Sequence, residues 1–271
     1  MTPRVRVIAV SYFGANDAKK LLRSLQSQTM GDWEFVLVEN SVDATQRTSL
    51  QTIGGDDPRV RVLTPDENLG YLGAARFARE HSQGTAEWTV IANVDIELPD
   101  SDSLLRLSEF SEAGVAVVAP GIISSRSGRD QNPFLVHRPT AQQMRRRAAR
   151  MRTPAQAQLT AVASKLKRMA LPSSATQAAG RIYAPHGSFM AIAREYFENG
   201  GTLEHPIFLF AEELTLAERV RALGMTVAYL PSIQVSHVEH GQMGVIRSGF
   251  VLREMVRAAR YGATLIEDES G

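Results

Sequence analysis

Acidic side chains occur in this sequence at positions where a fold could present them to a ligand. Asp95 follows a short apolar segment as the last residue of Asn93-Val94-Asp95. Its hard carboxylate oxygens suit Mg²⁺ or Mn²⁺, and such a cation acts as a Lewis acid on phosphate oxygens. Glu212 and Glu213 stand together at the start of a helical pattern. A carboxylate there can accept a proton in catalysis, or it can simply complement the helix dipole.

His237 is the candidate nitrogen ligand, because it closes the apolar segment 233–236. A neutral imidazole is an ordinary ligand for manganese-class ions, although a lone histidine more often has a structural role. His186 and His240 are weaker candidates for the same role. The sequence contains no cysteine, which excludes disulfides, thiolate chemistry and cysteine-ligated metals.

The elements that must position these residues are short apolar segments alternating with amphipathic ones. Strands are expected at Arg4–Ser11, Trp33–Val38, Val60–Leu63, Trp88–Ala92, Val115–Ala119, Arg181–Tyr183, Ser188–Ala193, Thr226–Leu230 and Ile233–His237. Helices are expected from a cap at Asn16 or Asp17 through Leu25, and at Gly70–Gln83, Ser101–Glu112, Glu212–Leu223 and Val245–Tyr261. This alternation predicts an α/β fold with a mainly parallel sheet covered on both faces.

The ends of the expected strands predict where a ligand binds. In open parallel sheets, ligands lie beyond the carboxyl ends of the strands. This rule selects four places, which are Ser11-Tyr12, Glu39-Asn40, 64–68 and 93–95. Gly70 and Gly73 permit close backbone approach, but they do not form the G-x-G-x-x-G pattern of a dinucleotide site.

Charge is distributed unevenly along the 271 residues, whose net charge is only +1. Residues 131–194 contain eleven basic residues and no Asp or Glu, whereas the rest of the chain has 19 basic and 29 acidic residues. Such a block indicates an anionic partner or a solvated face. Because aromatic residues are missing between Arg138 and Leu171, base stacking and therefore nucleic acid are not expected.

Several motifs then resemble family 2 glycosyltransferases, and in particular the bacterial rhamnosyltransferase-like members. The matching order runs from about residue 5 to about residue 240, interrupted by the basic block. It comprises segments 7–12, 21–29 and 33–41, Glu67-Asn68-Leu69-Gly70-Tyr71-Leu72-Gly73, Asn93-Val94-Asp95, 185–190, 208–213 and His237. The resemblance implies a GT-A fold and an inverting transfer of a hexosyl or deoxyhexosyl unit from a nucleotide-activated sugar.

The resemblance also implies roles for individual residues. Asp95 and His237 would bind a divalent cation, Mn²⁺ or Mg²⁺, and Glu213 or its neighbour Glu212 would be the catalytic base. The donor, a UDP- or dTDP-linked sugar, would contact Ser11, Tyr12, Glu39, Asn40, Asn68, Gly70, Gly73, Asn93 and Asp95. A carboxylate such as that of Glu39 can accept an N–H from a pyrimidine.

Two positions depart from the family pattern. Asn93 stands where the D-x-D motif begins with an aspartate, and an amide is a poorer metal ligand. Glu213 stands where the family commonly has an aspartate. These departures keep open a second interpretation, an inactive relative that binds a nucleotide or polyanion. A nucleotidyltransferase is a weaker alternative, because 11–14 lacks the glycine-rich opening of that class.

The expected organisation is a GT-A domain over 1–240, with a basic helical insertion at about 137–172, and a C-terminal amphipathic helix and tail over 241–271. We expect a cytoplasmic protein, because no signal peptide or membrane span is evident. The insertion predicts peripheral contact of 138–168 with an anionic membrane. Its apolar residues Met144, Ala148, Met151, Leu159, Val162, Leu166 and Met169 would lie in the headgroup region. The expected acceptor is a glycan or a lipid-linked molecule used in cell-envelope or polysaccharide synthesis.

Overall fold

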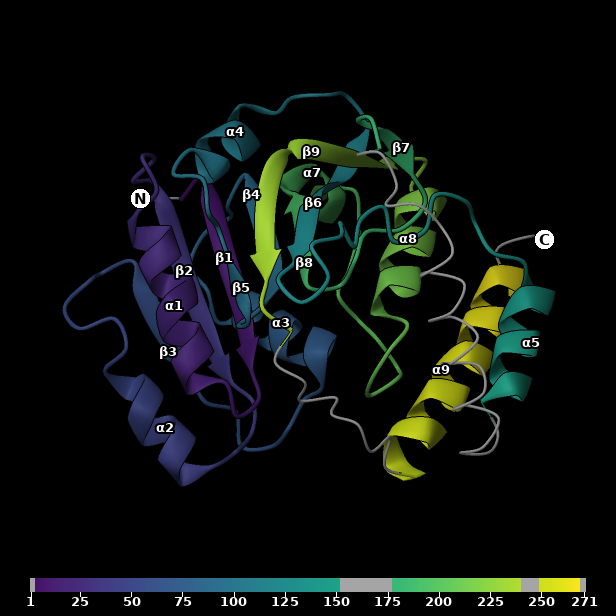
Figure 1. The fold of residues 1–271 in the computed structure, drawn as a ribbon, viewed down its shortest axis with the longest axis horizontal. Helices are drawn as coiled ribbons and strands as arrows, with labels where there is room; N and C mark the ends of the chain where they lie inside the picture. Colours follow the sequence, from purple (N-terminus) through teal and green to yellow (C-terminus); the bar gives the residue numbers. More distant parts are fainter. Residues whose placement is uncertain (1–2, 152–176, 240–248, 269–271) are drawn as a thin grey trace.

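The computed structural model describes residues 3–151, 177–239 and 249–268 (Figure 1). Strands in this part form one sheet in the order β3-β2-β1-β4-β8-β6-β9-β5, and β7 pairs with β9 at its side. The strands are β1 (Val5–Ser11), β2 (Trp33–Glu39), β3 (Val60–Leu63), β4 (Trp88–Asn93), β5 (Ile96–Glu97), β6 (Val115–Ser124), β7 (Gly180–Ile182), β8 (Phe189–Ala193) and β9 (Thr226–His237).

The helices are α1 (Ala15–Gln26), α2 (Ala44–Gln51), α3 (Tyr71–Glu80), α4 (Ser103–Glu109), α5 (Ala141–Arg150), α7 (Arg194–Glu198), α8 (Glu212–Ala222) and α9 (Gly249–Asp268). Strands β1 to β4 form a parallel unit, and β6 and β9 run in the same direction, because β8 pairs antiparallel with both β4 and β6. The α/β fold with a mainly parallel sheet is therefore confirmed.

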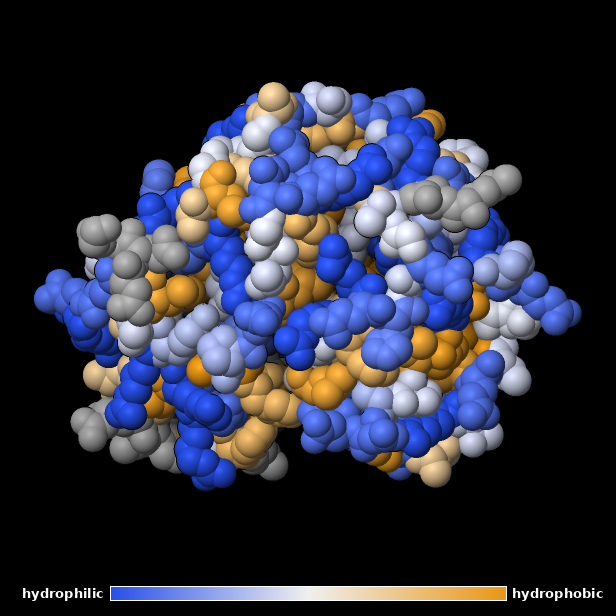
Figure 2. Space-filling view, turned by 180° about the vertical axis from the view of Figure 1, so that it is seen from behind, coloured by the Kyte–Doolittle hydropathy of each residue, from blue (hydrophilic) through white to orange (hydrophobic). Residues whose placement is uncertain are grey.

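Helices cover both faces of the sheet. On one face, the apolar sides of α1 and α4 pack on alternate residues of β1 and β2 such as Val7 and Phe35. On the other face, α3, α7 and α8 pack on the intervening residues, among them Ile8 and Val36. Burial on both faces explains why these strands are continuous apolar runs. The face seen from behind is mainly hydrophilic, with apolar residues showing in patches (Figure 2).

Several element boundaries differ from the sequence predictions. Helix α1 begins after Gly14 and its first residues include Asn16 and Asp17, so neither is the cap. Strand β9 continues through Pro231 as one strand, because a register shift against β6 between Pro120 and Gly121 absorbs the irregularity. Helices α3 and α4 are shorter than expected, while α9 extends beyond Tyr261 to Asp268. The short elements α2, α7 and β5 were missed.

The basic insertion begins with α5, which packs beside α9 at the edge of the molecule remote from α1 (Figure 1). A capping box at Thr140 and Gln143 starts α5. Its residues Met144 and Ala148 and the following Met151 are buried in a third apolar cluster with α8 and α9. The prediction that these three side chains contact lipid is therefore wrong, since α9 covers them. Residues Leu159, Val162, Leu166 and Met169 lie outside the described residues.

A buried carboxylate anchors the start of the insertion to α8. Glu218 is completely buried and accepts two hydrogen bonds from Arg138, from Nε and Nη2, both at 2.7 Å. Tyr183 donates its hydroxyl to the same carboxylate at 2.5 Å, and Arg138 also donates to the carbonyl of Ile266 at the end of α9. Arg138 is thus a structural arginine that joins α8 and α9.

Replacing Arg138 with glutamine should lower the free energy of unfolding by about 3 kcal/mol, because it leaves the buried Glu218 charge without its main partner. The matched control is Arg145→Gln, whose pair with Glu267 is about half exposed. This control should lose less than about 1 kcal/mol. Urea denaturation of both variants measures the difference, and equal losses would contradict the assigned role of Arg138.

Candidate active site

Most of the candidate residues predicted from the sequence lie at the edge of the sheet where the parallel strands end. Ser11, Glu39, Asn93 and His237 are the last residues of β1, β2, β4 and β9. Because β8 and β5 run in the opposite direction, the residues that precede them, 186–188 and 95, reach the same edge. The topology therefore explains how the distant motifs meet.

Pairing between β5 and β9 brings the two candidate metal ligands together. Ile96 is the register partner of His237, and the backbone N–H of Val238 donates to the carbonyl of Asp95 at 2.9 Å. As a result, His237 Nε2 lies 3.3 Å from Asp95 Oδ1. Strand register therefore brings the two side chains to the same place.

Two further side chains determine which nitrogen of His237 carries a proton. Gln131 Nε2 donates to Glu239 Oε1 at 2.5 Å, which orients the amide so that Gln131 Oε1 faces His237 Nδ1 at 2.7 Å. An amide oxygen can only accept, so Nδ1 carries a hydrogen, and Nε2 is the nitrogen that faces Asp95 Oδ1. Two electron-rich atoms at this separation require a positive charge, either a proton or a metal ion.

This donor set fits a divalent cation, with a carboxylate oxygen and an imidazole nitrogen oriented by a hydrogen bond on its other nitrogen. Within residues 3–151, 177–239 and 249–268, no group of three or more His, Cys, Asp or Glu side chains is placed to hold a metal ion. Asp95 and His237 would therefore supply two ligands, and oxygens of substrate and water the rest. Asn93 is half-buried, and its backbone N–H donates to the carbonyl of Ser188 at 3.0 Å.

Glu213, on the first turn of α8, contacts the segment 186–188 at the same edge of the sheet. Its Oε1 accepts from the backbone N–H of Gly187 at 3.2 Å, and a Cβ at Gly187 would lie only 2.7 Å from that oxygen. Tyr71 donates its hydroxyl to the carbonyl of Gly187 at 2.8 Å. Burial, followed by the charges of Glu212, Glu213 and Asp95, raises the pKa of Tyr71 well above its ordinary value. Tyr71 therefore remains a neutral donor among three carboxylates.

Glu212 has a different environment from its neighbour. It is buried, and its Oε1 accepts from the backbone N–H of Phe210 at 2.9 Å. Both Phe210 and Ala211 have positive φ, 71° and 66°, so Glu212 braces a backbone conformation that non-glycine residues adopt at a cost. Burial and the charge of Glu213 raise the pKa of Glu212 to about 8, and burial also raises the pKa of Glu213.

Strand β1 ends in one buried polar side chain and two exposed aromatic ones. Ser11 Oγ is buried and has no hydrogen-bond partner among the described residues. Tyr12 and Phe13 are 52% and 50% exposed, with ring centroids 4.9 Å apart. A buried hydroxyl without a partner costs stability, and exposed aromatic faces suit a stacked planar ligand.

Glu39 and Asn40 are buried, at 0% and 3% exposure. Glu39 accepts hydrogen bonds from the backbone N–H of Ser41 and from Arg47 Nε. The side-chain amide of Asn40 donates to Asn68 Oδ1 at 3.0 Å and to the carbonyl of Gly70, and its oxygen accepts from the N–H of Leu69. Both side chains thus hold the loops at this edge.

Comparison with known proteins now identifies the family. The model described as glycosyl transferase family 2 matches residues 6–166, more than half of the sequence. The chain belongs to this family. Among curated proteins, no sequence matches the chain at a significant level.

Three solved structures share the fold of this family 2 glycosyltransferase. The mannosyltransferase PcManGT from Pyrobaculum calidifontis, in complex with GDP-Man and Mn²⁺, is 16% identical, with a TM-score of 0.59 over 99% of this chain and 74% of its own. GalNAc-T7 with UDP, GalNAc and Mn²⁺ is 15% identical, with a TM-score of 0.63 over 95% of this chain and 47% of its own. TarS residues 1–349 from S. aureus is 13% identical, with a TM-score of 0.56 over 88% and 61%. Identities this low show the GT-A fold alone.

Two glycines of the family 2 motif have different surroundings. Gly70 has a φ of 70°, and a Cβ there would lie 2.6 Å from the carbonyl oxygen of Phe208, so only glycine fits where the two loops meet. Gly73 lies on α3 and lines a separate cavity of about 250 Å³ with Phe77 of the same helix and with Leu203 and His205. The structure therefore does not bring Gly73 together with Asp95 and Glu213.

His205 is a residue of this glycosyltransferase that sequence reasoning missed. Its Nε2 donates to the carbonyl of Phe210 at 3.0 Å, and its Nδ1 lies 2.9 Å from Thr215 Oγ1. The ring also packs edge-on against Tyr261 of α9. These contacts tie the loop before Glu212 to α8 and α9. No local pattern marks such a residue, because its partners come from three segments.

The free energy of unfolding should fall as the pH is lowered from about 6.5 to about 4. Burial lowers the pKa of His205 from 6.5 to about 4, so in this window the unfolded chain binds the additional proton. The stability is fully present above 6.5, and its loss across the window is on the order of 3 kcal/mol, because each pKa unit corresponds to about 1.4 kcal/mol. Urea denaturation at pH 7, 5.5 and 4.5 measures it. His205→Gln should flatten the slope, although His186, whose pKa is also lowered to about 4, contributes in the same range.

Proposed function

We propose that this protein is a metal-dependent glycosyltransferase that moves a sugar from a nucleoside-diphosphate sugar to a hydroxyl group of an acceptor. The observation that carries the proposal is the pair of Asp95, between β4 and β5, and His237, at the end of β9, with Glu213 on the first turn of α8 beside Gly187. The family membership supports the reaction class. Two structural neighbours were determined with Mn²⁺ and a nucleotide or nucleotide sugar, which supports the choice of donor.

In this proposal, Asp95 Oδ1 and His237 Nε2 hold a divalent cation, Mn²⁺ or Mg²⁺. When bound, the cation neutralises the charge that develops on the diphosphate leaving group. Gln131 and Glu239 fix the imidazole orientation, and the amide of Asn93 can hydrogen-bond to ribose or phosphate oxygens. We assign to the buried Ser11 hydroxyl, which has no hydrogen-bond partner among the described residues, a hydrogen bond to the nucleotide sugar.

We assign the base to Glu213 and a positioning role to Glu212. Glu213 is partly exposed as a residue whereas Glu212 is buried, and in the proposal the acceptor hydroxyl approaches the carboxylate of Glu213. The acceptor oxygen would form a bond to the anomeric carbon while the bond from that carbon to the diphosphate breaks, and the acceptor proton would pass to Glu213. A single displacement of this kind inverts the anomeric centre. Tyr71 and Gly187 hold the carboxylate in place.

For the nucleobase of the nucleotide sugar, we propose that Tyr12 supplies a stacking face. The residues Glu39, Asn40, Asn68 and Gly70 would shape the surrounding loops. The proposed donors are UDP- or dTDP-linked hexoses or deoxyhexoses, and GDP must be tested beside them. The proposed acceptor is a glycan or lipid-linked molecule of the bacterial cell envelope, which peripheral contact of 138–168 with an anionic membrane would bring close. No helix in the described part of the chain is long and apolar enough to cross a bilayer.

Calorimetric titration of UDP, dTDP and GDP, each with Mn²⁺ and with a chelator, tests the proposal. We expect one nucleotide to bind at least tenfold more tightly with Mn²⁺. Release of that nucleotide from its sugar conjugates then tests turnover. Metal-linked binding without turnover of any conjugate would instead favour the inactive binding module that the Asn93 departure suggests, and no metal-linked binding would refute the proposed function.

A further inference from the structure

The two side chains expected to contact the nucleobase are turned into the protein. Glu39 is fully buried, and its Oε1 accepts hydrogen bonds from both the backbone N–H and the hydroxyl of Ser41. Asn40 is buried as well, and both its amide nitrogen and its amide oxygen bond to groups of the segment 68–70. Neither side chain therefore presents a free polar group at the surface to a base.

Arg47, on α2, bridges the ends of two neighbouring strands. Its Nε donates to Glu39 Oε2 at 3.4 Å, and Glu39 is the last residue of β2. Its Nη2 donates to the carbonyl of Pro65 at 2.9 Å, just after β3 ends at Leu63. Helix α2 lies at the edge of the sheet toward which the arrow of β9 points (Figure 1). The guanidinium group is thus fixed where the parallel strands end and where ligands of such sheets bind.

Arg47 keeps hydrogen-bond donors that the protein does not use. A guanidinium group carries several N–H donors and no acceptor. One N–H on Nε and one on Nη2 are engaged by Glu39 and Pro65, and the others have no partner within residues 3–151, 177–239 and 249–268. The side chain is 32% exposed. A ligand at this edge therefore meets a charged donor whose position is set by two fixed acceptors.

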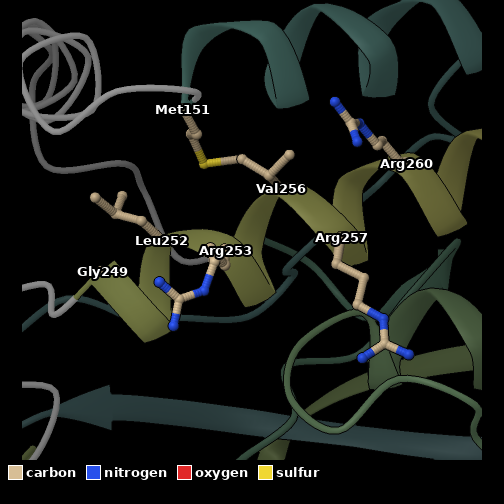
Figure 3. Close-up of a pocket in the computed structure, with 7 residues that line it drawn as sticks. All are labelled: Met151, Gly249, Leu252, Arg253, Val256, Arg257 and Arg260. Carbon is tan, nitrogen blue, oxygen red and sulfur yellow. The ribbon is translucent and has the colours of Figure 1, made fainter.

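The arginines of α9 lack such a fixed arrangement. Arg253, Arg257 and Arg260 line a cavity of about 530 Å³ together with Met151 and other residues. Arg260 points toward α5, whereas Arg253 and Arg257 point away from that helix and from Met151 (Figure 3). Their guanidinium groups do not converge on one point, whereas two acceptors hold the guanidinium group of Arg47 in place.

The spacing of the strands suits a nucleobase between Tyr12 and Arg47. Strands β1, β2 and β3 are neighbours in the sheet, so at about 4.8 Å between strands the ends of β1 and β3 lie roughly 10 Å apart. Tyr12, whose exposed ring is the proposed stacking face, follows β1, and Arg47 contacts the ends of β2 and β3. A base stacked on Tyr12 can then direct its edge at the guanidinium group.

We propose that Arg47 selects the nucleobase of the sugar donor by donating a hydrogen bond to an exocyclic carbonyl oxygen of the base. This inference rests on the proposed glycosyl transfer and narrows its donor to nucleotides of uracil, thymine or guanine. These bases carry the oxygen as O4 of the pyrimidine or O6 of the purine. Cytosine and adenine carry an amino group at the same place, which directs N–H at N–H and leaves the donor of Arg47 without an acceptor.

Calorimetric titration of the full chain with nucleoside diphosphates in Mn²⁺ tests the proposal. The nucleotides form two matched pairs, UDP with CDP and IDP with ADP, whose members differ in the exocyclic group and the adjoining ring nitrogen. In the pair that binds more tightly, the oxo member should bind roughly tenfold or more tightly than the amino member. Arg47→Met should reduce this ratio to about threefold or less, because the charged donor is lost.

Arg61→Met is the matched control. Arg61 likewise pairs with a carboxylate, that of Glu34 at 3.6 Å, donates to the backbone carbonyl of His81 at 3.0 Å, and is 36% exposed. It contacts the opposite end of β2, where Glu34 is the second residue, and should keep the wild-type ratio. A folded Arg47→Met protein that keeps the full ratio would overturn the proposal, as would equal binding of both members by the wild type.

A further measurement separates Arg47 from Glu39 and needs no variant. The analogue 4-thio-UDP retains the ring N–H of UDP but replaces O4 with sulfur, which is a weak hydrogen-bond acceptor. The wild-type protein should bind it about threefold or more weakly than UDP, because the bond from Arg47 is weakened. If purines bind more tightly, 6-thio-GDP and GDP are the corresponding pair. Equal affinity would overturn the proposal, in favour of a base whose ring N–H is read by Glu39.

The proposed function and this inference fail in different ways. Absence of metal-linked binding for every nucleotide refutes the proposed function. Metal-linked binding without preference for the oxo base, or with a preference that Arg47→Met retains, refutes only the role of Arg47. Thermal melting of both variants without ligand shows whether they fold, and if Arg47→Met does not, the thio analogue decides.

Discussion

Asp95→Ala should abolish the Mn²⁺-dependent part of nucleotide binding, weakening it roughly a hundredfold or more. Asp95 is the only carboxylate paired with His237 among the described residues, and without it the imidazole alone cannot hold a hard cation. The measurement is titration of the best nucleotide with Mn²⁺ and with a chelator. Binding with the chelator should be unchanged, because no loop contact is lost.

A second variant tests the same cation site through a residue that orients His237 and is not itself a proposed ligand. Gln131→Leu removes the hydrogen bond that fixes His237, and should weaken metal-linked binding by about ten- to a hundredfold. Thermal melting without ligand shows whether either variant is simply unfolded. If a folded Asp95→Ala protein keeps the wild-type difference between Mn²⁺ and chelator, Asp95 is not a metal ligand.

Glu213→Gln should reduce kcat by about 10²- to 10⁴-fold while nucleotide affinity in Mn²⁺ stays within a few-fold, since only proton transfer is removed. Glutamine can still accept the hydrogen bond from the N–H of Gly187, so the loop geometry should persist. Because burial raises the pKa of Glu213 and the base acts when ionised, wild-type kcat/KM should rise with pH above the ordinary carboxyl range.

Glu212→Gln is the matched control for this assignment. The substituted amide can still accept from the N–H of Phe210, so turnover should remain within about tenfold of wild type, even though the pKa of Glu212 is raised to about 8. If Glu212→Gln is inactive and Glu213→Gln retains turnover, the base is Glu212 and the roles assigned to the two residues are reversed.

The location of the candidate site could be predicted from the sequence because one physical rule determines it. Ser11, Glu39 and Asn93 close apolar runs, and parallel strands place such residues at a common edge. The strand-end rule alone does not place Asp95 next to His237, because this contact depends on the two-residue strand β5. A strand this short leaves no periodic signal in the sequence.

Other features could not be predicted because they depend on tertiary partners. The apolar stripe of Met144, Ala148 and Met151 shows that α5 has a buried side, but nothing in the stripe says whether α9 or lipid covers it. The place of Asn40 at a strand end and the family resemblance predicted ligand contact, whereas its amide bonds to Asn68 and Leu69 within the protein. Gln131 lies in irregular backbone, where no spacing rule links it to His237.

The dependence of the cation pair on β9 has a consequence for how the protein acquires activity during synthesis. Domains fold as the chain emerges, N-terminal parts first, and β1 to β4 pair only with one another until β8 is made. Asp95 therefore emerges from the ribosome long before His237 does. A nascent chain with folded β1 to β4 would therefore have Asp95 but not His237. Its ability to bind the divalent cation should appear in a single step, when β9 joins the sheet.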